Sequence, residues 1–458
     1  MSKSNLFSEF PEVSAKAWKQ HIQFNLQGED YNEKMIWESP EGIKVKPFYT
    51  AYDLKEKQLH QPSNKKWFVG QTIYAGNAIL ANEKALDVLE RGAEHLVFIV
   101  PTEEIKIEQL LKSIHLEKVV IHFELLFLSS EYISKILNFT LYTNAKIHLN
   151  IDIVGNLAKT GNWFFNLKKD HTILAEILKQ HSTVFSINTS LYQNAGATTV
   201  QQLAYALAHG NEYLNFLEQQ KEIKKEQQNF TFKIAIDSNY FFEIAKLKAL
   251  RLLWNVIASE YGVKTECTII AIPSKRNKTL YDYNTNMLRT TTECMAAVLG
   301  GADTICNAPY DSIFHRDNEF GERIARNQLL LLKEEAAFDK NYQATDGSYY
   351  IEYLTTEITE KALTLFKNIE KDGGFLKQMK EHSIQKKIKE SAIKEQDLFN
   401  KGKEILVGSN KYKNMADRMK NNLELYPFVK IKARKTLIEP IIERRLADIL
   451  EQKRLEDE

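Results

Sequence analysis

The middle of the sequence alternates eight short runs of β-branched and aromatic residues with longer amphipathic segments. Such alternation is typical of repeated βα units, in which each strand is followed by a helix. Several runs are apolar almost throughout, as expected for strands that are buried on both faces. The runs span residues 67–74, 95–100, 118–122, 146–152, 183–188, 230–236, 267–272 and 303–308.

Eight consecutive βα units favour a closed TIM (β/α)8 barrel, although an open doubly wound sheet has the same local pattern. We therefore predict an α/β fold with the barrel over residues 67–340. An N-terminal arm, residues 1–66, would wrap the barrel exterior or a partner subunit. Residues 341–458 are predicted as a C-terminal helical extension, with helical patterns over 355–369, 373–411 and 438–454.

The charge balance argues against a nucleic-acid partner, because 61 basic and 60 acidic side chains leave a net charge of only +1. No apolar run reaches the roughly 18 residues that a transmembrane helix requires, so no membrane span is expected. The three cysteines show no metal-binding spacing and indicate thiols in a reducing compartment. We predict a cytoplasmic protein.

Six segments, in order along the chain, carry a family resemblance. The clearest reads LRTTTECMAAVLGG at residues 288–301, and another reads NAGATTVQQLAYAL at residues 194–207. The others lie at residues 241–254, 320–335, 343–354 and 401–412. Together they resemble the substrate barrel of the methylmalonyl-CoA mutase family, and the KPFYTAYDL stretch resembles the opening of its small subunits.

The resemblance implies a barrel whose C-terminal mouth holds acyl-CoA, threaded along the barrel axis. It also implies a separate flavodoxin-like domain that binds adenosylcobalamin, the cofactor that starts a radical rearrangement between methylmalonyl-CoA and succinyl-CoA. No D-x-H-x-x-G motif of that domain occurs here. The roughly 45 residues that follow the last matching segment are too few for a doubly wound domain of about 100 residues. We expect no flavodoxin-like cobalamin domain in this chain.

Residues at the predicted mouth depart from the catalytic pattern of the family. Catalytic barrels carry R-Q-Y on the first strand, where this chain keeps only Gln71, although a slip of one or two residues would bring Tyr74 to the place of the tyrosine. Leu191 stands where the family's substrate-polarising histidine is expected, next to Tyr192 and Gln193. An aliphatic side chain donates no hydrogen bond, and loss of one preorganised donor costs roughly 10²–10³ in rate.

Other polar residues have both a functional and a structural interpretation. Lys275, Arg276 and Lys278 follow the seventh strand, where they could hold a CoA phosphate or form a solvated loop. His122 and His148 fall within strands, as general bases or as hydrogen-bonded core residues. Arg289 and Glu293, four apart on a predicted helix, are expected to pair.

These departures predict the small, non-catalytic subunit of a methylmalonyl-CoA mutase, bound to a large catalytic subunit that carries adenosylcobalamin. No catalytic and no metal-binding residues are assigned. A vestigial acyl-CoA site would comprise Gln71, Tyr74, Tyr192, Gln193, Lys275 and Arg276. One alternative is an acyl-CoA-binding barrel that works with a separate cobalamin-binding protein. Another is an unrelated barrel enzyme that uses a mouth carboxylate such as Asp152 or Asp237.

Overall fold

The computed structural model describes the chain except residues 1–8, 11–12, 55–65, 265, 341–343 and 431–432. Its main sheet has eight parallel strands in the order β6-β5-β4-β3-β10-β9-β8-β7. The strands are β3 (Phe68–Tyr74), β4 (His95–Val100), β5 (Val120–Leu125), β6 (Lys146–His148), β7 (Phe185–Asn188), β8 (Phe230–Ile236), β9 (Thr268–Pro273) and β10 (Thr304–Cys306). All eight predicted strands are present, which confirms the TIM-like barrel.

Two contacts close the sheet on itself. The first strand of the barrel, β3, pairs with the last, β10. At the other junction β6 ends at His148, and Asn150 has a positive φ of 37°. The residues on either side of Asn150 bond to the segment that leads into β7, through Leu149 N to Thr183 O (2.9 Å), Ile151 N to Val184 O (2.8 Å) and Ser186 N to Ile151 O (3.0 Å). Strand-to-strand bonding therefore continues around the barrel.

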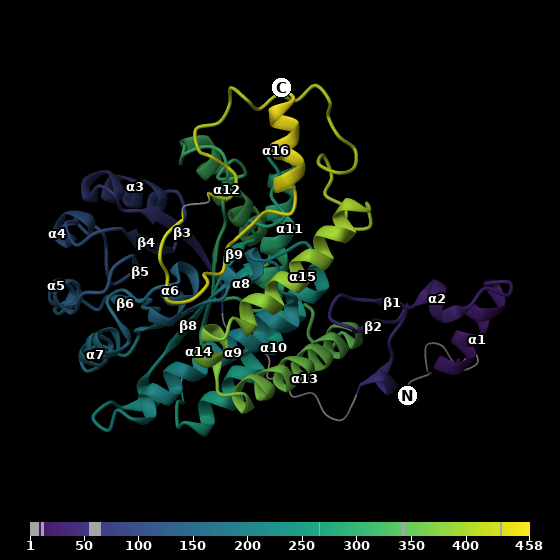
Figure 1. Cartoon of the computed structure of the whole chain (residues 1–458), viewed down its shortest axis with the longest axis horizontal. Coiled ribbons are helices and arrows are strands. Elements are labelled where there is room, and N and C mark those ends of the chain that lie inside the picture. Colours follow the sequence, from purple (N-terminus) through teal and green to yellow (C-terminus); the bar gives the residue numbers. More distant parts are fainter. Residues whose placement is uncertain (1–8, 11–12, 55–65, 265, 341–343, 431–432) are drawn as a thin grey trace, which may run out of the picture.

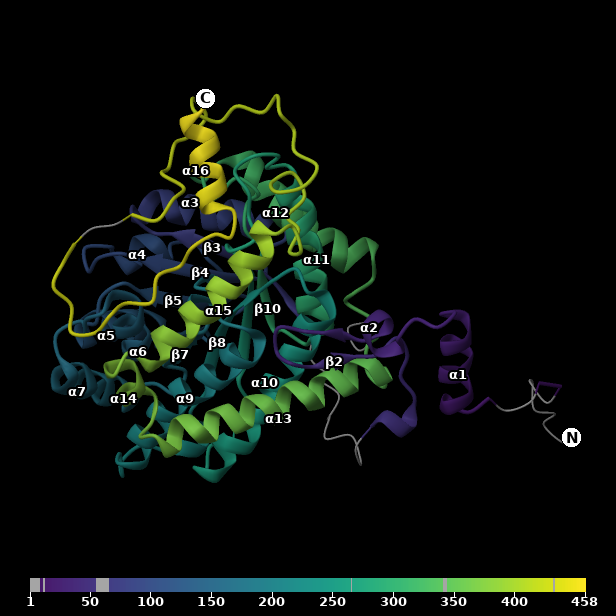
Figure 2. The ribbon, with the colours of Figure 1, turned by 45° about the vertical axis from the view of Figure 1, so that its right-hand side comes forward.

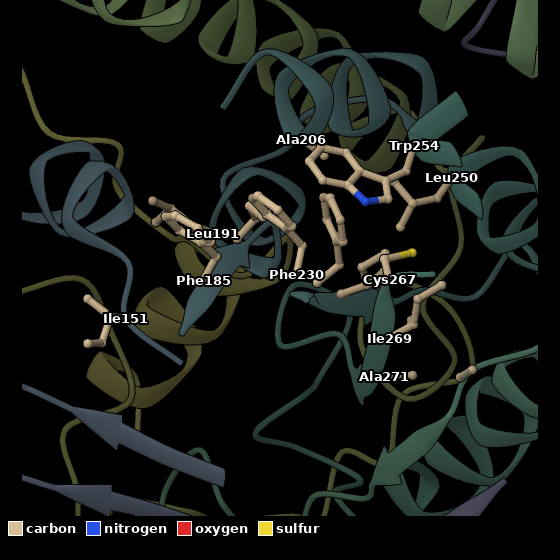
Figure 3. Packing of buried hydrophobic residues seen from close by; sticks show 14 of the residues in the cluster. Ile151, Phe185, Leu191, Ala206, Phe230, Leu250, Trp254, Cys267, Ile269 and Ala271 are labelled. Carbon is tan, nitrogen blue, oxygen red and sulfur yellow. The ribbon is translucent and has the colours of Figure 1, made fainter. Parts of the chain in front are cut away.

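Helices surround the sheet (Figures 1 and 2). Those between and directly after the strands are α3 (Ala78–Glu90), α4 (Ile107–Leu110), α5 (Ser130–Thr140), α6 (Ile153–Thr160), α7 (Leu167–Leu178), α8 (Ser190–Asn194), α9 (Thr199–Glu218), α10 (Tyr240–Glu260), α11 (Thr285–Leu299) and α12 (Glu319–Leu330). The outward-facing side of the strands is mostly apolar and packs against this helical layer. Figure 3 shows part of this layer, where Phe230 lies close to Trp254 and Leu250 of α10.

One helix crossing in this layer requires glycine. A Cβ on Gly210 of α9 would lie 2.5 Å from Cζ3 of the buried Trp254, far inside van der Waals contact. The absence of a side chain lets α9 approach α10 closely, and Trp254 then packs on Phe230 and Phe232 with ring centroids 4.8 and 4.9 Å apart. The glycine therefore allows the largest ring of this region to be fully buried.

Among the described residues of the N-terminal arm, the hairpin is anchored on the barrel and the first helix is not. Its helices are α1 (Ala15–Asn25) and α2 (Tyr31–Met35), and its hairpin pairs β1 (Trp37–Glu38) with β2 (Lys44–Val45). The hairpin is held by Ile43, which is 1% exposed, and by the edge of Trp37 on Phe242. In contrast, α1 buries no residue and projects away from the barrel (Figure 2).

The C-terminal extension differs from its prediction in two places. Helix α13 (Tyr349–Lys371) lies across α9 and α10, and α14 (Phe375–Lys380) and α15 (Ser383–Asn400) follow. The helical pattern over 373–411 is thus split at His382, which has a φ of 62°, and it ends at Asn400 rather than at residue 411. The helix predicted from residue 438 begins ten residues later, as α16 (Asp448–Glu456).

The late start of α16 has a tertiary cause. Residues 437–446 donate backbone hydrogen bonds to other elements instead of closing helical turns. Ile441 N donates to Ala158 O (2.8 Å), Arg444 N to Asn194 O (3.0 Å) and Leu446 N to Arg276 O (2.8 Å). This extended segment, the tail, therefore crosses the loops that follow β7 and β9.

Candidate functional site at the barrel mouth

The mouth is formed by loops at the C-terminal ends of the strands, and Asp237, directly after β8, is its hub. Its carboxylate accepts hydrogen bonds from Gln193 Nε2 (2.8 Å) and Asn277 Nδ2 (2.7 Å) and from the backbone N–H of Ser238 (2.7 Å). Ser274 donates in turn to Oε1 of Gln193 (2.9 Å). The groups that a ligand at the mouth would meet therefore already bind one another.

A buried ion pair lies beneath this hub. Lys278 Nζ is 2.8 Å from both carboxylate oxygens of Glu293, and Asn277 Nδ2 donates to the same carboxylate (2.7 Å). Burial raises the pKa of Glu293 to about 7, although Lys278 and Asn277 act in the opposite direction. The predicted pairing of Glu293 with Arg289 is wrong, because Arg289 turns instead toward Thr279, Thr285 and Asn286.

The loop after β9 is not a solvated basic loop. Arg276 is 4% exposed and donates from Nε to Glu395 of α15 (2.6 Å) and from Nη1 to Arg444 O of the tail (2.8 Å). Lys278 is 5% exposed and paired as described above. Lys275 has an exposed side chain, and only its backbone N–H is held, by Asn194 Oδ1 (2.9 Å). Of the three predicted cations, therefore, Lys275 alone presents its charge to solvent.

Tyr192 and Leu191 point into the protein rather than to the mouth. Leu191 is 4% exposed and belongs to the continuous apolar core, near Phe185 (Figure 3). Tyr192 is 0% exposed, and its hydroxyl lies 2.9 Å from Nδ1 of His209. Nε2 of that histidine donates to Asp152 (2.8 Å), so that Nδ1 accepts from the tyrosine.

Asp152 is bound by protein donors on several sides. Besides His209, Tyr213 donates to it (2.7 Å), as do the backbone N–H groups of Gly155 (2.7 Å) and Asn188 (3.0 Å). Burial alone raises the pKa of Asp152, but His209 and these hydrogen bonds hold it below its usual value. A carboxylate engaged in this way fixes the positions of the loops after β6 and β7 and is not a general base.

The two predicted residues on β3 face opposite sides. Tyr74, at the end of the strand, is 56% exposed and lies on the same face as Thr72. Gln71 is paired in register with Leu96 of the outer core and so faces the helical layer. Tyr74, Gln193, Lys275 and Arg276 thus lie at the C-terminal ends of the strands, whereas Gln71 and Tyr192 point elsewhere. The structure does not bring the six residues into one site.

The barrel lumen is filled with side chains. Val97, Ile270 and Cys306, from three different strands, pack together in a small cluster that is separate from the outer core. Lys233 of β8 donates to Glu124 of β5 (2.6 Å). The family resemblance implied acyl-CoA threaded along this axis, and in this chain the axis is occupied by side chains.

Three histidines line the lumen on adjacent strands. His122 stacks on His148 with ring centroids 4.3 Å apart, and His95 lies 6.3 Å from His122. Burial lowers the pKa of His95 and that of His122 to about 3, so both rings are neutral at pH 7. His122 is 1% exposed, which identifies it as a core residue rather than an accessible base.

Two cavities lie away from the mouth. One of about 660 Å³ opens at the N-terminal ends of the strands, where Phe68, His95 and Lys146 contribute to its wall. The other, of about 600 Å³, lies between the arm and the start of α13 and is lined by Phe48, Tyr49 and other aromatic residues.

Comparison with known proteins identifies the family. A family model described as methylmalonyl-CoA mutase matches residues 102–448. This chain belongs to the methylmalonyl-CoA mutase family. It is 35% identical over 453 residues to the methylmalonyl-CoA mutase small subunit of Porphyromonas gingivalis. The aligned region covers 91% of this chain and 72% of that protein.

Other members of the mutase family are more distant and longer. The methylmalonyl-CoA mutase large subunit of Porphyromonas gingivalis is 28% identical over 438 residues, or 82% of this chain and 61% of that protein. The human mitochondrial methylmalonyl-CoA mutase is 29% identical over 465 residues, or 88% of this chain and 60% of that protein. The chain therefore spans about three fifths of the length of these two mutases.

The mutase family implies adenosylcobalamin, and the described residues of this chain do not fit cobalt ligation at the mouth. His315, in the loop after β10, has Nδ1 on Asp311 (3.0 Å) and Nε2 on Asn422 (3.2 Å), so both of its ring nitrogens are engaged. Within the described ranges, no three or more His, Cys, Asp or Glu side chains are grouped as a metal site.

Among the helices that the structure describes, none has the length and apolarity to cross a membrane.

Lys233 and Glu124 were not among the residues predicted to line the mouth or the lumen. Each is the one Lys, Arg, Asp or Glu in its strand, in the runs FTFKIAI and VIHFEL. A charged residue within a strand that is buried on both faces must point to the lumen or to a partner of opposite charge, because an unpaired buried charge is strongly unfavourable. That pattern could have identified the two residues, although not their pairing.

Proposed function

We propose that this chain is the small, non-catalytic subunit of a heterodimeric, adenosylcobalamin-dependent methylmalonyl-CoA mutase. Its role would be to stabilise the large catalytic subunit, which would carry the cofactor and interconvert methylmalonyl-CoA and succinyl-CoA. The observation that carries the proposal is the packing of Leu191 in the apolar core. The position expected to supply a hydrogen-bond donor to the thioester thus supplies none, and the identity of 35% to a small subunit agrees.

Helix α1 is the proposed contact element, within an arm over residues 1–66 that precedes a barrel over 67–340 and an extension over 341–458. Isolated helices of fewer than about 12 residues are marginal in water, so an 11-residue helix without buried residues needs a surface to pack on. Phe24 is 81% exposed and Trp18 is 47% exposed on this helix. An apolar surface on the large subunit would cover both side chains.

The first experiment is co-purification of the tagged chain with the large subunit of the same organism, followed by assays of mutase activity with added adenosylcobalamin. We expect a 1:1 complex and no activity of this chain alone. Substitution F24D should weaken the complex at least tenfold. The matched control Y142D alters a side chain that is 94% exposed on the barrel, and should leave binding unchanged. Failure of the wild-type chains to associate would reject the proposal.

The second candidate is an acyl-CoA-binding barrel that works with a separate cobalamin-binding protein. The exposure of Tyr74 and of Lys275 at the mouth favours it, because an aromatic ring and a cation could meet an acyl-CoA there. Mutase activity of this chain with a free cobalamin-binding protein, without the large subunit, would select this candidate over the first.

We place the protein in the cytoplasm. Cys267, Cys294 and Cys306 are buried as thiols, which supports folding in a reducing compartment. Fractionation of cells with an antibody against the chain tests the location.

A further inference from the structure

The charged pair in the lumen is placed where it can close the barrel. In the closed order of strands, β5 and β8 are separated by β6 and β7, so a contact between them crosses the interior instead of following the wall. Lys233 Nζ and Glu124 Oε1 meet at 2.6 Å, with side chains that are 14% and 20% exposed. The residual exposure shows that one side of the pair is close to solvent.

The layer next to this pair is dry. Cys306 of β10 is 3% exposed and packs with Val97 and Ile270, which are each 1% exposed. Its thiol fits against β3 only because residue 70 is glycine, since a Cβ there would lie 2.5 Å from the sulfur. Burial raises the pKa of Cys306 to about 12, and Lys233 and Glu124 are both close enough to influence it.

We propose that Lys233 and Glu124 form a gate across the lumen, which seals the layer around Cys306 from the barrel mouth and excludes chain-like ligands from the barrel axis. Two long side chains from strands that are not neighbours meet across the lumen, and their opposite charges hold them together where a single charge would be unfavourable. Small polar residues at both positions would leave the passage open. These two residues are then specificity determinants that act by exclusion.

The inference deepens the proposed function, because a sealed lumen accounts for a mutase-family barrel that does not turn over substrate. It does not depend on the partner subunit. The gate concerns access of small molecules to the lumen of this chain alone, whereas the proposed function concerns association with the large subunit. Failure of one can therefore be distinguished from failure of the other.

The test uses Cys306 as a reporter of access to the lumen. The chain is treated with iodoacetamide at pH 8, and labelling of each cysteine is followed by peptide mass mapping. In the wild type we expect slow labelling of all three buried thiols. In E124S/K233S, labelling of Cys306 should be at least tenfold faster, while Cys267 and Cys294, which lie outside the lumen, remain slow. Adding C306S to the double variant should remove the fast label.

The matched control is K84S/E322S, which removes an ion pair between α3 and α12 on the outside of the barrel. It should label like the wild type. If the double gate variant labels all three cysteines, it has unfolded, and the single variants E124S and K233S are then judged by the same criterion. Fast labelling of Cys306 in the wild type, or unchanged labelling in the folded gate variants, would overturn the proposal.

Discussion

Introducing a histidine at residue 191 should destabilise the protein without creating mutase activity. Leu191 is 4% exposed, and removing a buried leucine side chain forfeits about 1.5–3 kcal/mol of apolar burial. An imidazole in its place adds polar atoms without hydrogen-bond partners, which costs a further 1–3 kcal/mol or so. We therefore expect L191H to lower the free energy of unfolding by roughly 3–5 kcal/mol.

This loss is large relative to the approximately 5–15 kcal/mol of a typical native protein. With an unfolding entropy of about 2 cal/mol/K per residue, 458 residues give about 1 kcal/mol/K, so the melting temperature should fall by roughly 3–5 °C. The assay is thermal unfolding followed by intrinsic tryptophan fluorescence. The matched control L191M keeps an apolar side chain of similar volume and should cost less than about 1.5 kcal/mol.

The reasoning would be refuted by an L191H variant that melts at the wild-type temperature. Such a result would mean that residue 191 faces water at the mouth, where a histidine could meet a thioester. A gain of methylmalonyl-CoA turnover in this variant, with a cobalamin-binding protein present, would contradict the non-catalytic assignment directly.

Further predictions concern the lumen and the buried Asp152 network. Because burial lowers the pKa of His95 and that of His122 to about 3, the unfolded chain binds protons below the usual histidine pKa of about 6.5 while the folded chain does not. The contribution of these two histidines to the free energy of unfolding should therefore be fully present above pH 6.5 and decline as the pH falls toward 3. Equal melting temperatures at pH 7.5 and 4.5 would contradict this. D152N should lose about 1–3 kcal/mol of stability in urea titrations, because an amide NH2 group would then face donors that the carboxylate oxygens now accept from; a change below about 0.5 kcal/mol would place Asp152 outside the core network. Y192F should lose about 1–2 kcal/mol, since Nδ1 of His209 loses its donor, and it should bind the large subunit like the wild type if Tyr192 is structural.

The barrel could be predicted from the sequence because its signal is local. Each strand is a short apolar run and each helix a periodic one, so all eight strands were located within a few residues. The tail could not be predicted in this way. Its residues have helical patterning, yet the carbonyls of Ala158, Asn194 and Arg276 accept its backbone donors, and those partners lie far away in the sequence.

The candidate site was harder to predict than the fold. Successive side chains of a strand point to opposite faces of the sheet, so residues three apart do not share a face. This alternation could have indicated that Gln71 and Tyr74 of β3 face opposite sides. The direction of Tyr192 could not be read in this way, since it depends on the position of His209 on α9. Likewise, the meeting of Lys233 with Glu124 depends on how the closed sheet staggers its strands.

The long reach of the tail affects how the protein is made. Asn194 Nδ2 donates to Glu443, a residue 249 positions later in the chain. At translation rates of about 5–20 residues per second, roughly 12–50 s separate the appearance of these two residues. In the later part of that interval, once β10 has been made, the nascent barrel has its mouth loops without the segment that covers Arg276. A nascent-chain chaperone would therefore meet an open barrel mouth, whereas a chaperone that acts on the finished protein would meet one already covered by the tail.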